Sequence, residues 1–140
     1  MTQFSEDPYA SIVELSKAFC EGSLCPSQVV AAQLARRGLI DPYLGSYQQV
    51  YHLSAVWASK AADKLFSANQ RIGPFHGIPF AIKDIYDFEG RVTSCGSWEM
   101  KDRISSQTGT ILKRLLDAGG ILVGKTKTVE CALGGWGTNK

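Results

Sequence analysis

Residues 73–84 read GPFHGIPFAIKD, and this stretch decides how the second half of the chain is interpreted. A short apolar run from Ile78 to Ile85 has proline and glycine at its border and is interrupted by Lys83 and Asp84. Its length and borders predict a buried β-strand. Burying an ammonium among apolar groups is costly and favours the neutral amine, which could act as a base. The alternative is a lysine paired with Asp84 or Asp87 at a strand end.

The chain after this stretch alternates helix and strand signals. Apolar residues between Thr108 and Ala118 recur at helical spacing, and Gly119-Gly120 would end that helix. Ile121-Leu122-Val123 predicts a second short buried strand, and residues 132–137 are glycine-rich and typical of a loop. The order strand, helix, strand predicts a sheet layered with helices.

The first half of the chain has helix signals only. A capping acid and a proline at Asp7-Pro8 predict a helix that ends at Gly22. Pro26 predicts a second helix that ends at Gly38, and a longer helix should include the apolar residues between Leu53 and Leu65.

Together these signals predict an α/β fold in one domain. We expect N-terminal helices over residues 1–72, followed over residues 73–140 by part of a mixed β-sheet layered with helices. The 140 residues can bury a single core, and 44% hydrophobic with 20% charged residues is an ordinary globular composition.

Charge and cysteine content argue against several classes of function. The 15 basic and 13 acidic residues leave a net charge of +2, which is too balanced to indicate nucleic-acid binding. No apolar stretch reaches the roughly 18–20 residues that span a bilayer, and the polar N-terminus does not resemble a secretory signal. The four cysteines and two histidines show no metal-ligand spacing. We expect a cytoplasmic protein without a membrane span, a metal, a cofactor or a nucleic-acid partner.

Residues 119–126 read GGILVGKT and match the phosphate-loop pattern G-x-x-x-x-G-K-[ST]. That loop requires a preceding strand and a following helix, so that backbone N–H groups surround the phosphates. Here a helix precedes the first glycine, and the apolar residues between the glycines favour a strand interior. We interpret Gly119 to Thr126 as strand and turn, with nucleotide binding as a weaker alternative.

Four ordered segments resemble motifs of the amidase signature family. Residues 73–84 are similar to G-P-L-x-G-I-P-x-x-V-K-D, and residues 93–97 (TSCGS) are similar to T-T-x-G-S. Residues 118–126 (AGGILVGKT) resemble A-G-A-x-x-x-G-K-T, and residues 130–139 (ECALGGWGTN) resemble E-F-A-x-G-G-x-G-x-N. The resemblance implies that residues 1–140 are the N-terminal part of a single amidase domain, with an incomplete amidase-signature fold.

The resemblance implies a catalytic role for Lys83. In this family the catalytic group is a Ser–cis-Ser–Lys triad, in which a neutral lysine takes a proton from the nucleophilic serine through a bridging serine. The family motifs that carry both serines follow the segment that ends here at Asn139, so we expect the serine partners to be absent from the chain. Ser94 and Ser97 lie in a turn and are expected to be structural. The 140-residue chain is therefore expected to be inactive alone.

The same resemblance implies a substrate-binding segment after Glu130. The candidate residues are Cys131, Ala132, Leu133, Gly134 and Gly135. Cys131 stands where the family often has phenylalanine, so a smaller side chain there could alter which acyl group fits. The expected substrate is a small-molecule amide, whose identity the sequence does not specify.

A non-enzymatic alternative remains open at this point. The chain could be a non-catalytic fragment or a partner subunit of an amidase. Such a chain could self-associate through an exposed sheet edge, because unpaired strand edges invite further pairing.

Overall fold

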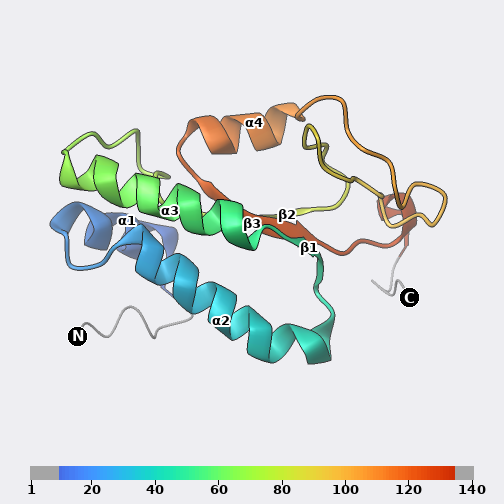
Figure 1. Cartoon of the computed structure of the whole chain (residues 1–140), viewed down its shortest axis with the longest axis horizontal. Helices are drawn as coiled ribbons and strands as arrows, with labels where there is room; N and C mark the ends of the chain where they lie inside the picture. Colours follow the sequence, from blue (N-terminus) through green and yellow to red (C-terminus); the bar gives the residue numbers. More distant parts are fainter. Residues whose placement is uncertain (1–9, 135–140) are drawn as a thin grey trace.

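The computed structural model describes residues 10–134, which form a sheet between two helical layers. Helices α2 and α3 lie on one side of the sheet and helix α4 on the other (Figure 1). The elements in chain order are α1 (Ile12–Glu21), α2 (Pro26–Leu44), β1 (Tyr47–Val50), α3 (His52–Ser67), β2 (Pro79–Lys83), α4 (Thr110–Asp117), β3 (Ile121–Thr126) and the short 3-10 helix η2 (Glu130–Ala132).

Helix α1 begins at Ile12. Its N-cap is Ser11, which forms a reciprocal capping box with Glu14. The expected start at Asp7-Pro8 lies outside the described residues. The helix ends as predicted at Gly22, whose φ of 68° is a left-handed conformation that glycine adopts without strain.

Helix α2 is longer than predicted. It continues through Gly38 and Pro42 to Leu44, and Gly45 ends it with a φ of 60°. The expected end at Gly38 is therefore wrong. The reason is a buried anchor in the last turn, where the Asp41 carboxylate accepts hydrogen bonds from the backbone N–H of Ser46 and the Arg37 guanidinium.

The sheet has the order β1-β3-β2 among the described residues. Strand β3 is central, antiparallel to β1 and parallel to β2. The mixed sheet and the helix between β2 and β3 confirm the predicted α/β class. Strand β1 was not predicted, and it lies within residues 1–72, which were expected to be helical.

Each face of the sheet has its own apolar core. The core under α2 and α3 contains Val30, Ala55, Ala62, Ile121 and Val123. The core under α4 contains Tyr51, Ile82, Leu112 and Leu122. Adjacent residues of β3 thus pack against opposite layers, as expected for a strand buried on both faces. The predicted helices at α3 and α4 are confirmed.

Candidate active site at the carboxyl ends of β2 and β3

Lys83 is the last residue of β2, and its side chain is exposed. The expectation that this lysine is buried among apolar groups is therefore wrong for the described residues. The physical reason is that β2 is the edge strand of the sheet. Ile82 packs toward α4, whereas Ala81 and Lys83 alternate onto the opposite side, where α2 and α3 leave both side chains exposed.

Neither carboxylate that was considered as a partner pairs with Lys83. Asp84 forms its ion pair with Lys125, and Asp87 forms its ion pair with Arg103. Lys83 therefore carries an exposed amine at the end of a parallel strand. Ligands of open α/β sheets commonly bind at this end of the strands.

The buried lysine of this region is Lys125 on β3, which the sequence analysis did not select. Its side chain is 0% exposed and its ammonium has three acceptors. It donates to Oδ1 of Asp84 at 2.9 Å, to the carbonyl of Val92 at 3.0 Å and to the hydroxyl of Thr93. All three N–H donors of the ammonium are satisfied.

Asp84 is equally buried and equally satisfied. Besides Lys125, its carboxylate accepts from the hydroxyl of Ser94 at 2.6 Å and from the backbone N–H of Ser94 at 3.1 Å. Its own N–H donates to the carbonyl of Thr126. A buried charge is stable only when it is paired and hydrogen-bonded, and both members of this pair meet that condition.

A chain of hydroxyl groups leads from Lys125 to a second ion pair. The hydroxyl oxygens of Thr93 and Ser105 lie 2.8 Å apart, and the Ser105 hydroxyl oxygen lies 2.7 Å from Oδ1 of Asp87. Because the carboxylate only accepts, Ser105 donates to Asp87 and Thr93 donates to Ser105. The Ser105 hydrogen bond, opposed by partial burial and assisted by Arg103, lowers the pKa of Asp87.

Ser94 and Ser97 both direct their hydroxyls at carboxylates. Ser94 donates to Asp84, and Ser97 donates to Oε1 of Glu130 at 2.6 Å. Ser94 thereby joins the turn to the buried Asp84–Lys125 pair, and Ser97 joins it to η2. These contacts agree with the structural role expected for both serines.

Part of the candidate substrate segment lies in and after η2. Cys131 and Ala132 have φ values of 50° and 60°, and Leu133 is 83% exposed. Such left-handed residues other than glycine are costly and occur preferentially at functional sites. Gly134 is described and exposed, while Gly135 lies outside the described residues.

The turn that contains Ser94 and Ser97 is hydrogen-bonded to this segment on one side and to Asp84, the residue after β2, on the other. The N–H of Cys131 donates to the carbonyl of Cys95 at 2.8 Å, and Ser97 holds Glu130. Cys95 is also left-handed, with a φ of 52°. The structure thus places the candidate segment against the turn that contacts Asp84. Among the described residues, no backbone hydrogen bond joins Lys83 to the candidate segment.

Residues 121–126 form a strand and not a phosphate-binding loop. All of β3 except Thr126 is buried, and the amine of Lys125 is fully engaged with protein acceptors. No free loop remains there to surround a phosphate. The nucleotide-binding alternative therefore lacks its structural basis.

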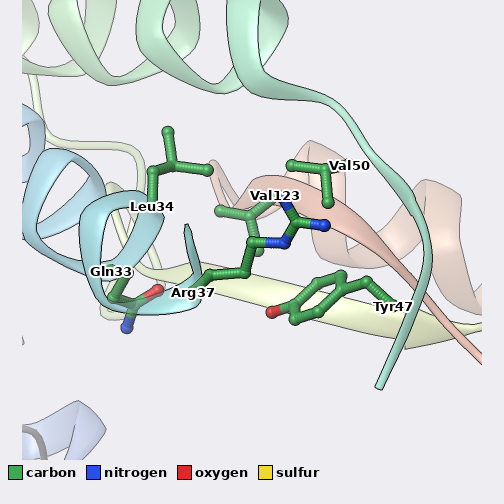
Figure 2. A pocket seen from close by; sticks show the side chains of 6 residues that line it. All are labelled: Gln33, Leu34, Arg37, Tyr47, Val50 and Val123. Carbon is green, nitrogen blue, oxygen red and sulfur yellow. The ribbon is translucent and has the colours of Figure 1, made fainter. Parts of the chain in front are cut away.

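A small pocket lies on the opposite side of the sheet from α4. It encloses about 210 Å³, part of it open solvent, and is lined by Gln33, Leu34, Arg37, Tyr47, Val50 and Val123. Figure 2 shows the Arg37 side chain lying beside Tyr47 and Val50 in this pocket. Lys83 does not line it. No helix within residues 10–134 has the length and apolarity needed to cross a bilayer.

Comparison with known proteins places these motifs in one family. The family model described as Amidase matches residues 28–140. The A subunit of glutamyl-tRNA(Gln) amidotransferase from Acidothermus cellulolyticus is 32% identical over 122 residues, covering 87% of this chain and 24% of that protein. Acylamidase from Rhodococcus erythropolis is 28% identical, covering 87% of this chain and 26% of that protein. The chain spans about a quarter of the length of the curated relatives it matches.

Solved structures show the same fold. The peptide amidase of Stenotrophomonas maltophilia aligns with a TM-score of 0.80 and 27% identity, covering 88% of this chain and 26% of that chain. Fatty acid amide hydrolase aligns with a TM-score of 0.80 and 22% identity, covering 85% of this chain and 21% of that chain, which is a likeness of fold.

Proposed function

We propose an amide-hydrolase function for this protein, from the premise that the chain belongs to the amidase family. The proposed reaction is hydrolysis of a carbon–nitrogen amide bond in a small molecule. Lys83 is the proposed catalytic base. The nucleophilic and bridging serines of the Ser–cis-Ser–Lys mechanism are not supplied by these 140 residues, so the isolated chain is proposed to be inactive.

The observation that carries this proposal is the position of Lys83. Its amine is exposed at the carboxyl end of β2, and both neighbouring carboxylates are occupied by other cations. An exposed lysine is accessible to a hydroxyl supplied from outside the described residues.

The proposed mechanism uses Lys83 in its neutral form. Its amine takes a proton, through the bridging serine, from the nucleophilic serine, which attacks the amide carbonyl. Backbone N–H groups near the nucleophile stabilise the oxyanion, the amine or ammonia leaves, and water then releases the acid. The apolar surroundings that favour a neutral amine must come from groups that cover the exposed face of β2.

Residues 131–135 are the proposed substrate-binding segment. The left-handed backbone at Cys131 and Ala132 and the exposure of Leu133 support this role. The small Cys131 side chain, in place of the family's usual phenylalanine, would enlarge the space available to the acyl group.

The decisive experiment tests Lys83 in the protein expressed from the whole reading frame that contains these residues. Lys83→Ala should reduce amide turnover by roughly 10⁴-fold or more while leaving the circular dichroism spectrum unchanged. The matched control is Lys60→Ala, an exposed lysine of α3, which should retain turnover. Near-normal turnover in Lys83→Ala would remove Lys83 from the mechanism.

A separate experiment tests the proposed inactivity of the 140-residue chain. A fluorophosphonate probe labels an activated serine covalently, so the isolated chain should remain unlabelled. Labelling at Ser94 or Ser97 would contradict both the inactivity and the structural role of these serines.

A partner-subunit role is the second candidate. Large apolar side chains are exposed at the end of α2, with Leu39 75%, Tyr43 90% and Leu44 69% exposed. The outer edge of β2 pairs with no other described strand. Exposed apolar groups and open strand edges favour association. Sedimentation of the purified chain tests this role, because a strictly monomeric chain with a cooperative thermal transition would count against it.

A further inference from the structure

Lys83 and Asp84 are adjacent in sequence but lie on opposite faces of the sheet. Successive side chains of a strand alternate, so the exposed Lys83 faces away from the layer that buries Asp84. We propose that Lys125 is a positioning residue for Lys83, because its ion pair holds the Asp84 carboxylate on the covered face and balances its charge. This inference rests on the proposed function of Lys83.

The pair is built to hold the carboxylate in one place. Oδ1 of Asp84 is bound by Lys125, and Oδ2 is bound twice by Ser94. The backbone N–H of Asp84 is fixed to β3 through Thr126. With both oxygens and the backbone fixed, the side chain cannot turn toward Lys83 without breaking several buried hydrogen bonds.

A β-bulge in β3 makes this pairing possible. Phe80 pairs with Leu122, but the next residue of β2, Ala81, pairs with Gly124. Val123 is therefore an extra residue in β3, and every side chain after it changes face.

The change of face determines where Lys125 lies. Ile121 and Val123 pack under α2 and α3, so strict alternation would place Lys125 on that same side. Because of the bulge, Lys125 instead pairs with Ile82, which packs toward α4. The bulge thus brings the ammonium to the face that contains Asp84.

Glycine at position 124 allows the bulge to fit against β1. A Cβ added there would lie 2.4 Å from the carbonyl oxygen of Gln49 and 3.0 Å from the Tyr47 ring. No side chain fits at these distances, so the close contact between β3 and β1 requires glycine.

Other charged and titratable groups around the pair are already partnered. Asp87 and Arg103, from the loop after β2, pair with each other. Arg91 lies over the Tyr51 ring at 5.3 Å. Burial raises the pKa of Tyr51 to about 12, with Arg91 opposing and Asp84 assisting. Lys125 is consequently the cation that balances Asp84.

The proposal makes different predictions for the two members of the pair. Without Lys125, the unbalanced carboxylate stabilises the ammonium form of Lys83, so a higher pH is needed to produce the neutral amine. Without the Asp84 carboxylate, a fully buried amine releases its proton, so no net charge remains inside and the reactivity of Lys83 is unchanged.

The test measures acylation of Lys83 in the 140-residue chain, because only the neutral amine reacts. The chain is labelled with a trace of acetic anhydride at a series of pH values, and mass spectrometry measures the acetylation of Lys83 relative to Lys60 as internal reference. The pH at which half of the maximal Lys83 acetylation rate is reached is the midpoint for Lys83. Lys125→Met should raise this midpoint, whereas Asp84→Asn and the double variant should keep the wild-type value. A structural role alone predicts unchanged midpoints in all folded variants.

Each outcome decides the proposal. An unshifted midpoint in Lys125→Met with a native circular dichroism spectrum, or a shifted midpoint in Asp84→Asn, would overturn it. If Lys125→Met does not fold, Lys125→Gln removes the same charge while keeping a hydrogen-bond donor, and the conservative Lys125→Arg should keep the wild-type midpoint. The acylation experiment does not depend on turnover. An unshifted midpoint in Lys125→Met together with loss of turnover in Lys83→Ala would refute only the positioning role of Lys125. A raised midpoint in Lys125→Met together with normal turnover in Lys83→Ala would refute the proposed function instead.

Discussion

The two ends of the parallel β2–β3 pair are built from opposite chemistry. At the amino end, the backbone of Gly119 and Gly120 packs directly against His76 and Phe75, and the N–H of Gly77 donates to the carbonyl of Gly119. At the carboxyl end, charged side chains dominate, with the Asp84–Lys125 pair inside and Lys83 outside.

This difference shows how one strand pair separates stability from chemistry. The amino end closes by van der Waals contact and backbone hydrogen bonds. The carboxyl end satisfies one lysine completely within the fold and leaves the other with its amine accessible. Loss of a contact at the amino end should therefore change stability alone, whereas changes at the carboxyl end should also change the reactivity of Lys83.

The strongest contrast is expected between the two lysines of the carboxyl end. Lys125→Met should lower the free energy of unfolding by about 3–5 kcal/mol, because it leaves the Asp84 carboxylate buried without its cation. Lys83→Met should change it by no more than about 0.5 kcal/mol, since the side chain is exposed. Urea unfolding of both variants measures the contrast. Equal losses would mean that the two lysines do not differ in structural role.

The amino end can be tested with a single methyl group. Gly119 has a φ of 84°, and a Cβ there would lie 2.8 Å from Cδ2 of His76. Gly119→Ala should cost about 2–4 kcal/mol through left-handed strain and overpacking. Gly38→Ala is the matched control, because α2 has open space around Gly38 and alanine favours a helix. The control should stabilise the chain by about 0.5–1 kcal/mol. A tolerated Gly119→Ala would show that the close contact is not required.

The smallest expected effect is a difference in the pH range over which each end loses stability. Burial, assisted by Arg71, lowers the pKa of His76 below its ordinary value of 6.5. The unfolded chain then binds the proton first, so stability present above pH 6.5 is lost as the pH falls toward the folded pKa. Asp87 has a pKa lowered from 3.8, so its contribution is lost only below that pH.

Unfolding free energies measured in urea between pH 8 and pH 5 test this separation. The wild-type chain should lose stability over this range, and His76→Asn, which keeps an acceptor near the N–H of Ile72, should show a smaller loss. Ser105→Ala should change the pH dependence of the unfolding free energy only below pH 4, because Ser105 donates to Asp87. An identical pH dependence in wild type and His76→Asn would assign the loss to another group.

Sequence reasoning predicted the helices α3 and α4 and the strands β2 and β3, because their apolar spacing and glycine borders are local signals. Strand β1 escaped prediction because its four residues, YQQV, have no apolar alternation and gain their conformation by pairing with β3. The end of α2 was misplaced because the Asp41 anchor depends on residues beyond the helix.

At the candidate site, the motif located Lys83 but not its environment. Apolar neighbours along a strand do not reveal whether the strand lies at the edge or in the centre of a sheet. The position of β2 at the edge is what leaves Lys83 exposed. The central position of β3 could have been inferred from ILVG, since strands buried on both faces are continuously apolar. A lysine after such a run needs a buried carboxylate, which would have indicated the pairing of Lys125 with Asp84.

The extra residue in β3 has a consequence for how sequences of this kind can be aligned or grafted. Lys125 lies beside Asp84 only because the bulge compensates for the extra residue Val123. Removing Val123 together with the bulge would leave Lys125 opposite Ile82, whereas losing the bulge at the present length would place Thr126 beside the carboxylate and the ammonium on the opposite face. The length of this segment and the presence of the bulge must therefore change together when a sequence is aligned or a donor segment is grafted.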